Sequence, residues 1–231
     1  MNYIKNVARF ASHLGSFPMS ILSRFLRLGR PNRDDPVAIQ PWMPVAATKR
    51  LQLHLQGAKV YLEYGAGGST LLSGKLNCPI VYSVESDRGF LDTLSHQMHE
   101  AHSDTTFHPT YINIGPTRKL GYPTDPTFRP LWPNYCTAVW KDLNVRSLCP
   151  DLVLIDGRFR VACFAYSLAH ASSGTILLFD DYERRNRYHI AGSLLKPAGI
   201  YGGLAEFVVP PDVDKHACRQ MFDKFKHRPG M

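Results

Sequence analysis

The fold of this chain is decided by the stretch Val60-Tyr61-Leu62-Glu63-Tyr64-Gly65-Ala66-Gly67-Gly68-Ser69-Thr70-Leu71-Leu72. Its first five residues are mostly apolar and aromatic, as in a buried strand, and glycines follow at once. A helical pattern then runs over 69–76. Glycine permits a sharp turn and lets a ligand approach the backbone, while the helix N-terminus offers free N–H groups. The stretch therefore predicts a strand, a ligand-binding turn and a helix.

The same alternation of strand and helix continues along the chain. Strand patterns separated by helical ones are expected at 60–64, 80–84, 106–114, 151–155 and 174–179. Gly202 and Gly203 lie between two further short strand patterns, as in a hairpin that adds antiparallel strands at one edge. Such an order implies right-handed crossovers and helices on both faces of the sheet. We therefore predict an α/β, Rossmann-like, doubly wound and mostly parallel sheet of about seven strands.

Two acidic residues flank the glycine turn in this sheet. Glu63 lies two positions before the first glycine, and Glu85 ends the next strand 22 residues later, close to the spacing of about 20 typical of an acid that binds ribose. An NAD-type turn needs a third glycine where this chain has Thr70, which would crowd a pyrophosphate. A carboxylate at Glu63 favours a cationic ligand, such as S-adenosylmethionine. The alternative is a tight turn that only packs strand against helix.

These motifs resemble those of the class I S-adenosylmethionine-dependent methyltransferases. The acid-x-Gly-x-Gly pattern begins at Glu63, and Ser69 stands where many members have glycine. The segments LEYGAGGSTLL, VYSVESDR, NIGPT, DLVLIDGRFRV and LLFDDY are similar to those of a bacterial methyltransferase-like group, over roughly 58–210. The resemblance implies S-adenosylmethionine as cofactor. The residues it assigns to cofactor binding are Glu63, Gly65, Ala66, Gly67, Gly68 and Ser69 at the methionine end, Glu85 at the ribose and Asn113 near the adenine, where related sequences commonly carry aspartate.

Three aspartates stand at the expected carboxyl ends of two strands. Asp156 follows the strand at 151–155, and Asp180 and Asp181 follow the strand at 174–179. Three carboxylates so close repel unless a cation joins them, and Mg²⁺ takes oxygen ligands. A substrate hydroxyl bound to such an ion loses its proton more easily. The arrangement resembles the metal site of catechol and macrocin-type O-methyltransferases, which predicts Asp156, Asp180 and Asp181 as metal ligands.

The residues after Asp156 depart from those enzymes, which often carry a base there. Arg158 cannot act as a base and is expected to hold a carboxylate or phosphate of the substrate. Asp156, Arg158 and Asp180 are thus the candidate catalytic residues. The alternative is a structural cluster in which Asp181 caps a helix and Asp156 pairs with Arg158.

The segment 115–133 carries five prolines, which exclude a long regular element. Loops of this length are often functional, so Tyr122, Phe128 and Trp132 are expected either to close over a substrate or to pin the loop to the core. His170 and His189 are the histidines nearest the aspartates in the sequence. Each is a candidate base, although a lone histidine is more often structural or solvated.

The net charge of +8 is concentrated at the N-terminus. Six of the 27 basic residues precede the first acidic residue, Asp34, which leaves 21 basic against 19 acidic residues in the body. A nearly neutral body argues against a groove that tracks nucleic-acid phosphates. Basic and apolar residues alternate over 1–30 as in amphipathic helices, which predicts membrane contact, targeting or docking on a protein surface. We expect a basic arm and linker at 1–42 and a domain at 43–231.

The expected location is the cytoplasm, and peripheral membrane contact is one of the three roles open to residues 1–30. The five cysteines are scattered without metal-ligand spacing, as in a reduced protein. No apolar run reaches the roughly 18 residues that span a bilayer.

The expected activity is methyl transfer from S-adenosylmethionine to an oxygen of a small polar molecule, sugar-like or acidic, with a divalent metal. One rival hypothesis is a non-catalytic scaffold that acts through its basic arm. Another is an adenine-specific nucleic-acid methyltransferase, against which stand the neutral body and the lack of an Asn-Pro-Pro-Tyr motif. We therefore expect a small-molecule substrate and no nucleic-acid partner.

Overall fold

A computed structural model describes residues 37, 40–101 and 104–231. In this part of the chain, seven strands form one sheet in the order β3-β2-β1-β6-β7-β9-β8. Their bounds are Val60–Tyr64 (β1), Ile80–Glu85 (β2), Thr106–Tyr111 (β3), Leu152–Ile155 (β6), Ile176–Phe179 (β7), Gly199–Tyr201 (β8) and Leu204–Val208 (β9). The strands β3, β2, β1, β6 and β7 run parallel, whereas β9 is antiparallel to both β7 and β8. The predicted Rossmann-like α/β fold, with its antiparallel edge hairpin, is confirmed.

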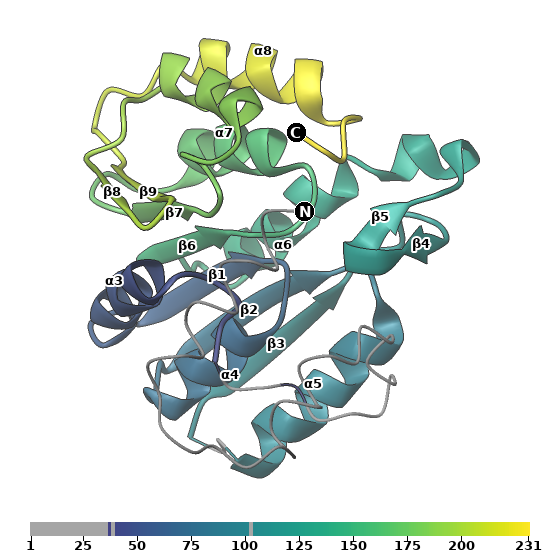
Figure 1. Ribbon diagram of the computed structural model, residues 1–231, viewed down its shortest axis with the longest axis vertical. Helices are drawn as coiled ribbons and strands as arrows, with labels where there is room; N and C mark the ends of the chain where they lie inside the picture. Colours follow the sequence, from purple (N-terminus) through teal and green to yellow (C-terminus); the bar gives the residue numbers. More distant parts are fainter. Residues whose placement is uncertain (1–36, 38–39, 102–103) are drawn as a thin grey trace, which may run out of the picture. The chain divides into compact units, whose positions relative to one another are not determined.

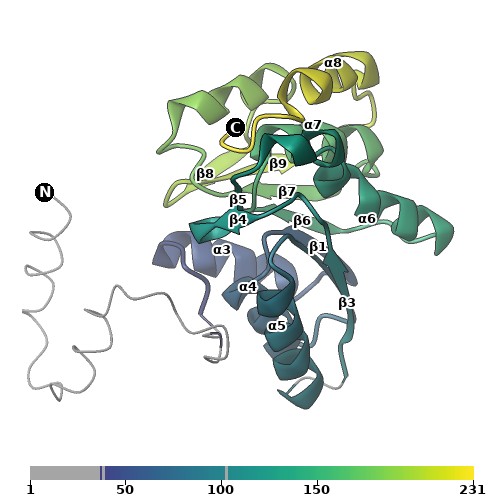
Figure 2. The same ribbon diagram turned by 90° about the vertical axis from the view of Figure 1, so that its right-hand side faces the viewer.

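Helices cover both faces of the sheet (Figures 1 and 2). One layer contains α3 (Val45–Leu55), α4 (Gly68–Lys75) and α5 (Arg88–Ala101). The other contains α6 (Asn134–Val145), α7 (Arg160–His170) and α8 (Lys215–Phe225). Because both faces are covered, β6 and β7 are continuous apolar runs rather than alternating ones.

The central strand β1 shows how the sequence divides between the two layers. All five of its residues are buried. Leu62 and Tyr64 join the core beneath α6, α7 and α8, while Tyr61 joins the core beneath α3 and α4. Since strand side chains alternate between faces, Glu63 points to the same face as Tyr61. The single charged residue of this strand therefore lies beneath α4.

The order of the strands reverses between β1 and β6. From β1 the chain moves outward to β2 and β3, and then returns to form β6 on the other side of β1. Doubly wound sheets bind ligands at the carboxyl ends of the strands where this reversal occurs. Gly65 directly follows β1 and Asp156 directly follows β6, so both residues lie at that point.

The segment 115–133 is more regular than expected. It contains a short antiparallel hairpin of β4 (Thr117–Arg118) and β5 (Tyr122–Pro123), joined by the 3₁₀ turn η1 (Lys119–Gly121). A second 3₁₀ helix, η2 (Pro126–Leu131), follows. Its prolines fit because short 3₁₀ turns need few backbone donors. A third, η3 (Asn186–Ser193), lies after β7.

The predicted basic arm at 1–30 lies outside the described residues. Within the described ranges, no helix combines the length and apolar character needed to cross a membrane.

Candidate cofactor and acceptor site

The turn after β1 touches the turn after β6. Gly65 has a φ of +92°, in the left-handed region that favours glycine. A Cβ on Gly65 would lie 2.8 Å from the Cα of Gly157. A Cβ on Gly157 would lie 2.9 Å from the Gly65 nitrogen and 2.2 Å from the hydroxyl oxygen of Tyr135. Gly65 and Gly157 must therefore both be glycine. Since Gly157 directly follows Asp156, this contact holds the glycine turn close to Asp156.

Gly67 differs from Gly65 because open space surrounds it. A Cβ on Gly67 would meet no atom within 4 Å, and its φ of 168° is extended backbone. Its N–H donates to the hydroxyl oxygen of Thr70 at 2.9 Å. Thr70 therefore caps the start of α4, and the space beside Gly67 allows a ligand to approach the backbone.

Glu63 lies fully buried behind this turn. Its carboxylate oxygens accept hydrogen bonds from four hydroxyl groups, those of Tyr61, Ser69, Thr70 and Ser83. Burial raises the pKa of Glu63, and the hydroxyl donors oppose that shift. Hydroxyls from β1, β2 and α4 surround this carboxylate, so it does not stand open to a ligand in this structure. Glu63 instead ties these three elements together.

Glu85 ends β2 at the same edge of the sheet and is partly exposed. Its Oε1 accepts hydrogen bonds from the backbone N–H groups of Ser86 and Asp87, at 2.5 and 3.0 Å. Burial raises the pKa of Glu85, and these backbone bonds oppose the shift. A Cβ on Gly121, in η1, would lie 3.8 Å from the same oxygen. The β4–β5 hairpin therefore covers the carboxylate that is expected to bind ribose.

Asn113 follows β3 and is exposed. Its side-chain oxygen accepts a hydrogen bond from the N–H of Gly115 at 2.9 Å. An amide oxygen has a second lone pair, which is available to an adenine amine. Because β3, β2 and β1 are neighbours, Asn113, Glu85 and Gly67 follow one another along one edge of the sheet. This order is compatible with adenine, ribose and methionine subsites, and the assignment of each residue stays a prediction.

A buried arginine stands where the metal ion was expected. Arg160, the first residue of α7, is 4% exposed. Its Nη2 donates to Asp156 Oδ1 at 2.6 Å. Its Nη1 lies 3.5 Å from Asp180 Oδ2 and 3.6 Å from Asp181 Oδ2. The same guanidinium also donates to the backbone carbonyls of Asp156, Gly157 and Asp180.

The predicted metal site at Asp156, Asp180 and Asp181 is therefore not supported. The three carboxylates do converge, but on a guanidinium group. Among the described residues, no group of three or more histidine, cysteine or acidic side chains is arranged to hold a metal ion. The alternative pairing also needs correction, since the partner of Asp156 is Arg160 and not Arg158. Asp156 lies before the start of α7, so the helical i, i+4 rule does not apply to this pair and the sequence carried no clear signal for it.

Of the three carboxylates, Asp156 has the most exposed side chain. It is 30% exposed, against 22% for Asp181 and 9% for Asp180. Burial raises the pKa of Asp156 to about 8, while the charge of Arg160 opposes this shift and Asp180 adds to it. Burial likewise raises the pKa of Asp180. A carboxylate whose pKa is raised is a stronger base than an ordinary one, which suits Asp156 to exchange a proton with a bound substrate.

Arg158 is partly exposed and forms no ion pair within the described residues. Its Nε is buried without a hydrogen-bond partner. Its guanidinium carbon lies 5.9 Å from the ring centre of Tyr122, and that of Arg118 lies 5.0 Å from the same ring. Two guanidinium groups thus contact one aromatic ring in the hairpin over Glu85. Unpaired guanidinium groups are suited to bind a carboxylate or a phosphate.

Two residues after the strand ends have left-handed backbone conformations. Phe159, after β6, has a φ of +54°, and Asp181, after β7, has a φ of +59°. Non-glycine residues are uncommon there, and each costs about 1–3 kcal/mol. Such strain persists where the surrounding structure enforces it, often at functional sites. Here the turn at Phe159 leads directly into α7, which begins with Arg160.

Neither candidate histidine bonds to the aspartates within the described structure. His170 ends α7, at the opposite end of that helix from Arg160, and its ring contacts the Tyr166 carbonyl oxygen at 2.8 Å. His189 is exposed, with its ring centre 5.0 Å from that of Tyr182. His170 therefore lies at the far end of α7 from the aspartates, and His189 stays a candidate base without a bond to them.

Two aromatic residues of the segment 115–133 pin it to the core. The indole N–H of Trp132 donates to the Ile114 carbonyl oxygen at 3.0 Å. The ring of Phe128 packs so closely on Gly115 that a Cβ there would lie 2.5 Å from it. Tyr122, by contrast, is partly exposed beside the arginines.

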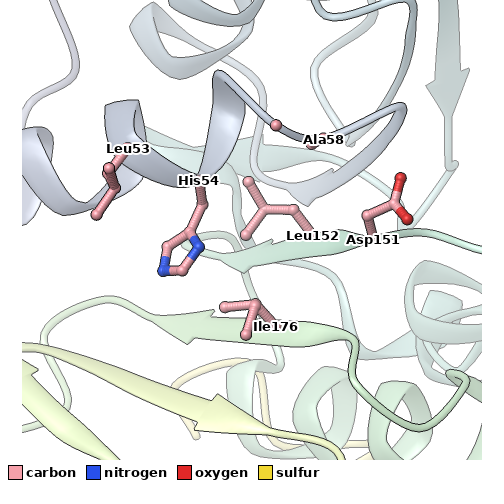
Figure 3. Close-up of a pocket in the computed structure, with 7 residues that line it drawn as sticks. Leu53, His54, Ala58, Asp151, Leu152 and Ile176 are labelled. Carbon is pink, nitrogen blue, oxygen red and sulfur yellow. The ribbon is translucent and has the colours of Figure 1, made fainter.

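A small cavity of about 240 Å³ lies at the opposite edge of the sheet (Figure 3). It is lined by Leu53, His54, Gly57, Ala58, Asp151, Leu152 and Ile176. Leu152 and Ile176 begin β6 and β7, so this cavity opens at the amino ends of the strands. It is therefore separate from the glycine turn, and the chemistry argued above does not involve it.

A glycine turn at the point of strand reversal, followed by an acid at the end of the next strand, defines a Rossmann-like domain that binds a nucleotide-type cofactor. The chain is similar to a methyltransferase-like protein from Silicibacter pomeroyi, with 32% identity over 82% of this chain and 98% of that one, at a TM-score of 0.75. It shares the fold of cofactor-bound Rv0187 from MTB, at 15% identity over 89% and 96% of the two chains, with a TM-score of 0.50. No family model and no curated protein matches the sequence. The chain belongs to the methyltransferase-like proteins of the class I S-adenosylmethionine-dependent methyltransferase family.

Proposed function

We propose that the protein transfers a methyl group from S-adenosylmethionine to an oxygen atom of a small polar molecule, sugar-like or acidic. The contact between Gly65 and Gly157 is the observation that carries this proposal. It brings the open backbone at Gly67, where the cofactor is proposed to bind, close to the reachable carboxylate of Asp156.

S-adenosylmethionine, when bound, supplies a methyl group on a positively charged sulfur. In this chain the N-terminus of α4 and Glu85 are the groups proposed to bind and orient it. Asp156 accepts the proton of the acceptor hydroxyl as the new bond from oxygen to carbon forms and the bond from carbon to sulfur breaks. Alignment of the two reactants contributes most of the rate, since transfer needs little beyond orientation and an activated oxygen.

Arg158 supports an acidic acceptor. Its buried Nε lacks a hydrogen-bond partner, and such a group is costly unless something pairs with it. The rest of the Arg158 side chain is partly exposed and forms no ion pair among the described residues, so an acceptor carboxylate or phosphate can pair with its guanidinium group. The magnesium ion expected from the three aspartates is left out of the proposal, because the Arg160 guanidinium already pairs with their carboxylates.

Calorimetry on the full-length protein tests the cofactor. We expect S-adenosylmethionine and S-adenosylhomocysteine to bind in the micromolar range, and NAD to bind far more weakly. A Gly67→Val variant should keep its fold, because a Cβ at this position meets no atom within 4 Å, yet its side chain should block cofactor binding. Gly57→Val is the matched control, since Gly57 lies at the other edge of the sheet. Tighter binding of NAD would overturn the proposal.

Release of S-adenosylhomocysteine in the presence of hydroxylated acids and sugars tests the transfer itself. Turnover with an acidic acceptor, and its loss in Arg158→Gln at unchanged cofactor affinity, is the expected result. Cofactor binding without turnover on any acceptor would favour a scaffold that has kept the fold and lost the chemistry.

A further inference from the structure

We infer that Arg160 is a built-in replacement for the divalent cation that three converging carboxylates otherwise require, so that this site works without a metal ion. The structural part of this inference concerns only Arg160 and its partners. Its consequence for activity rests on the proposed methyl transfer.

The positions of the guanidinium nitrogens carry the inference. Nη2 lies 2.6 Å from Asp156 Oδ1, and Nη1 lies within 3.6 Å of a carboxylate oxygen on Asp180 and on Asp181. Arg160 thus contacts all three side chains that a cation would join. Magnesium requires its oxygen ligands at about 2.0–2.1 Å in octahedral geometry. Such an ion cannot share these oxygens with a guanidinium that already lies between them.

Arginine side chains also balance the negative charge of Asp156, Asp180 and Asp181. A second guanidinium, from Arg185, pairs with Asp181 at 2.7 Å. Two arginines therefore face three carboxylates, which is the same formal positive charge that one divalent ion would supply. A further divalent ion would be repelled by the buried charge of Arg160.

Arg160 is also fixed in place. Its side chain is 5% exposed, its Nε donates to the Gly157 carbonyl oxygen at 3.1 Å, and its guanidinium carbon lies 5.7 Å from the ring centre of Tyr188. Displacing the guanidinium would leave the Gly157 and Asp180 carbonyl oxygens without this donor. Arg160 acts as a positioning residue, because it holds the Asp156 carboxylate at the mouth of the site.

The first test asks whether the full-length wild-type protein binds a metal ion at this site. Mn²⁺ is titrated into the protein, and its binding is monitored by electron paramagnetic resonance. We expect no stoichiometric Mn²⁺ binding, and no change in melting temperature with Mn²⁺ or with a chelator. Stoichiometric binding that disappears in Asp156→Asn would overturn the inference. This readout does not depend on methyl transfer, so it separates the inference from the proposed function.

An Arg160→Ala variant supplies the second test, since it removes the built-in charge and leaves space. Its melting temperature should fall by roughly 10 °C, because an uncompensated buried charge remains. Added Mn²⁺ or guanidinium ion should restore part of that loss, and Mn²⁺ should now bind. The control Arg146→Ala removes an arginine from an exposed i, i+4 pair with Asp142, and should show neither effect.

Failure of Mn²⁺ and guanidinium to rescue a folded Arg160→Ala would overturn the inference. If that variant does not fold, Arg160→Gln replaces it with the same expected results, and Mn²⁺ binding by the wild-type protein remains an independent test. Once an acceptor is identified, transfer should proceed undiminished in the presence of a chelator.

Discussion

Gly65 and Gly157 lie in backbone contact, so that each leaves no room for a side chain on the other. The contact joins the carboxyl ends of β1 and β6, where the order of the strands reverses. The geometry of the whole site depends on it, because the open turn at Gly67 lies on one side of the contact and Asp156 lies on the other.

A Gly157→Ala substitution should therefore destabilise the protein. Its Cβ would meet the Tyr135 hydroxyl at 2.2 Å and the Gly65 backbone at 2.9 Å, and the resulting overpacking costs about 1–3 kcal/mol. Urea unfolding measures the change. Gly67→Ala is the control, because its Cβ meets nothing within 4 Å and its stability should match that of the wild type. Equal loss in both variants would contradict this explanation.

Glu63→Gln should lower stability by roughly 2–4 kcal/mol, because an amide nitrogen cannot accept the hydroxyl hydrogen bonds that one carboxylate oxygen now receives. The site is fully buried, so water cannot compensate. The free energy of unfolding of the variant, compared with that of the exposed change Glu183→Gln, checks this. Surface substitutions usually change the free energy of unfolding by no more than about 0.5 kcal/mol. A loss of stability below that value would mean that the four hydroxyl groups around Glu63 can find other acceptors.

Asp156→Asn should leave cofactor affinity within a factor of about two, as expected for a side chain that contacts the acceptor and not the cofactor. The rate of transfer should fall by about 10²–10⁴, which is typical for the loss of a general base. Single-turnover kinetics and calorimetry separate the two effects. The exposed change Asp212→Asn serves as the control. An unchanged rate would exclude Asp156 as the proton acceptor.

The pH dependence of stability should report the pair of Arg50 and Glu206. Arg50 donates two hydrogen bonds, of 2.5 and 2.6 Å, to the carboxylate oxygens of Glu206. These hydrogen bonds lower the pKa of Glu206 below its ordinary value of 4.5. The folded state thus binds fewer protons than the unfolded state. The stabilisation is present above pH 4.5 and is lost as the pH falls through the folded pKa.

Glu206→Gln should accordingly be less stable than the wild type by about 2–4 kcal/mol near pH 7, because Arg50 and His54 lose a charged partner. The difference should shrink as the pH falls from 4.5 through the folded pKa of Glu206. Denaturant midpoints across the acid range measure it. A difference that stays constant with pH would show that the pair contributes packing rather than charge.

Residues 1–30 are proposed to bind anionic membrane surfaces, on the basis of their basic and apolar sequence pattern. Their deletion should abolish sedimentation with vesicles that contain phosphatidylserine and leave cofactor binding intact. Neutral vesicles and high salt serve as controls. A full-length protein that ignores anionic vesicles at low salt would refute the membrane role and leave docking on a protein surface as the better explanation.

The sequence by itself determined the fold, because its information is local and periodic. The stretch from Val60 to Leu72 specifies a strand, a turn and a helix through apolar runs and glycine. Alternation of such units leaves few topologies open, and the Gly202-Gly203 pair marked the hairpin at the edge. The acid at the end of β2 could likewise be expected, since strand ends of a parallel sheet meet at one edge.

Only the tertiary structure decided what the charged residues do. The sequence located Asp156, Asp180 and Asp181 at one edge of the sheet but could not show that Arg160 pairs with all three, because that depends on how α7 leaves β6 through the turn at Phe159. The orientation of Glu63 away from open space follows from the alternation of side chains in β1 and from where α4 packs. A carboxylate interacts with whatever lies within a few ångströms of it, and the identity of that neighbour is set by long-range packing rather than by the residues adjacent in the chain.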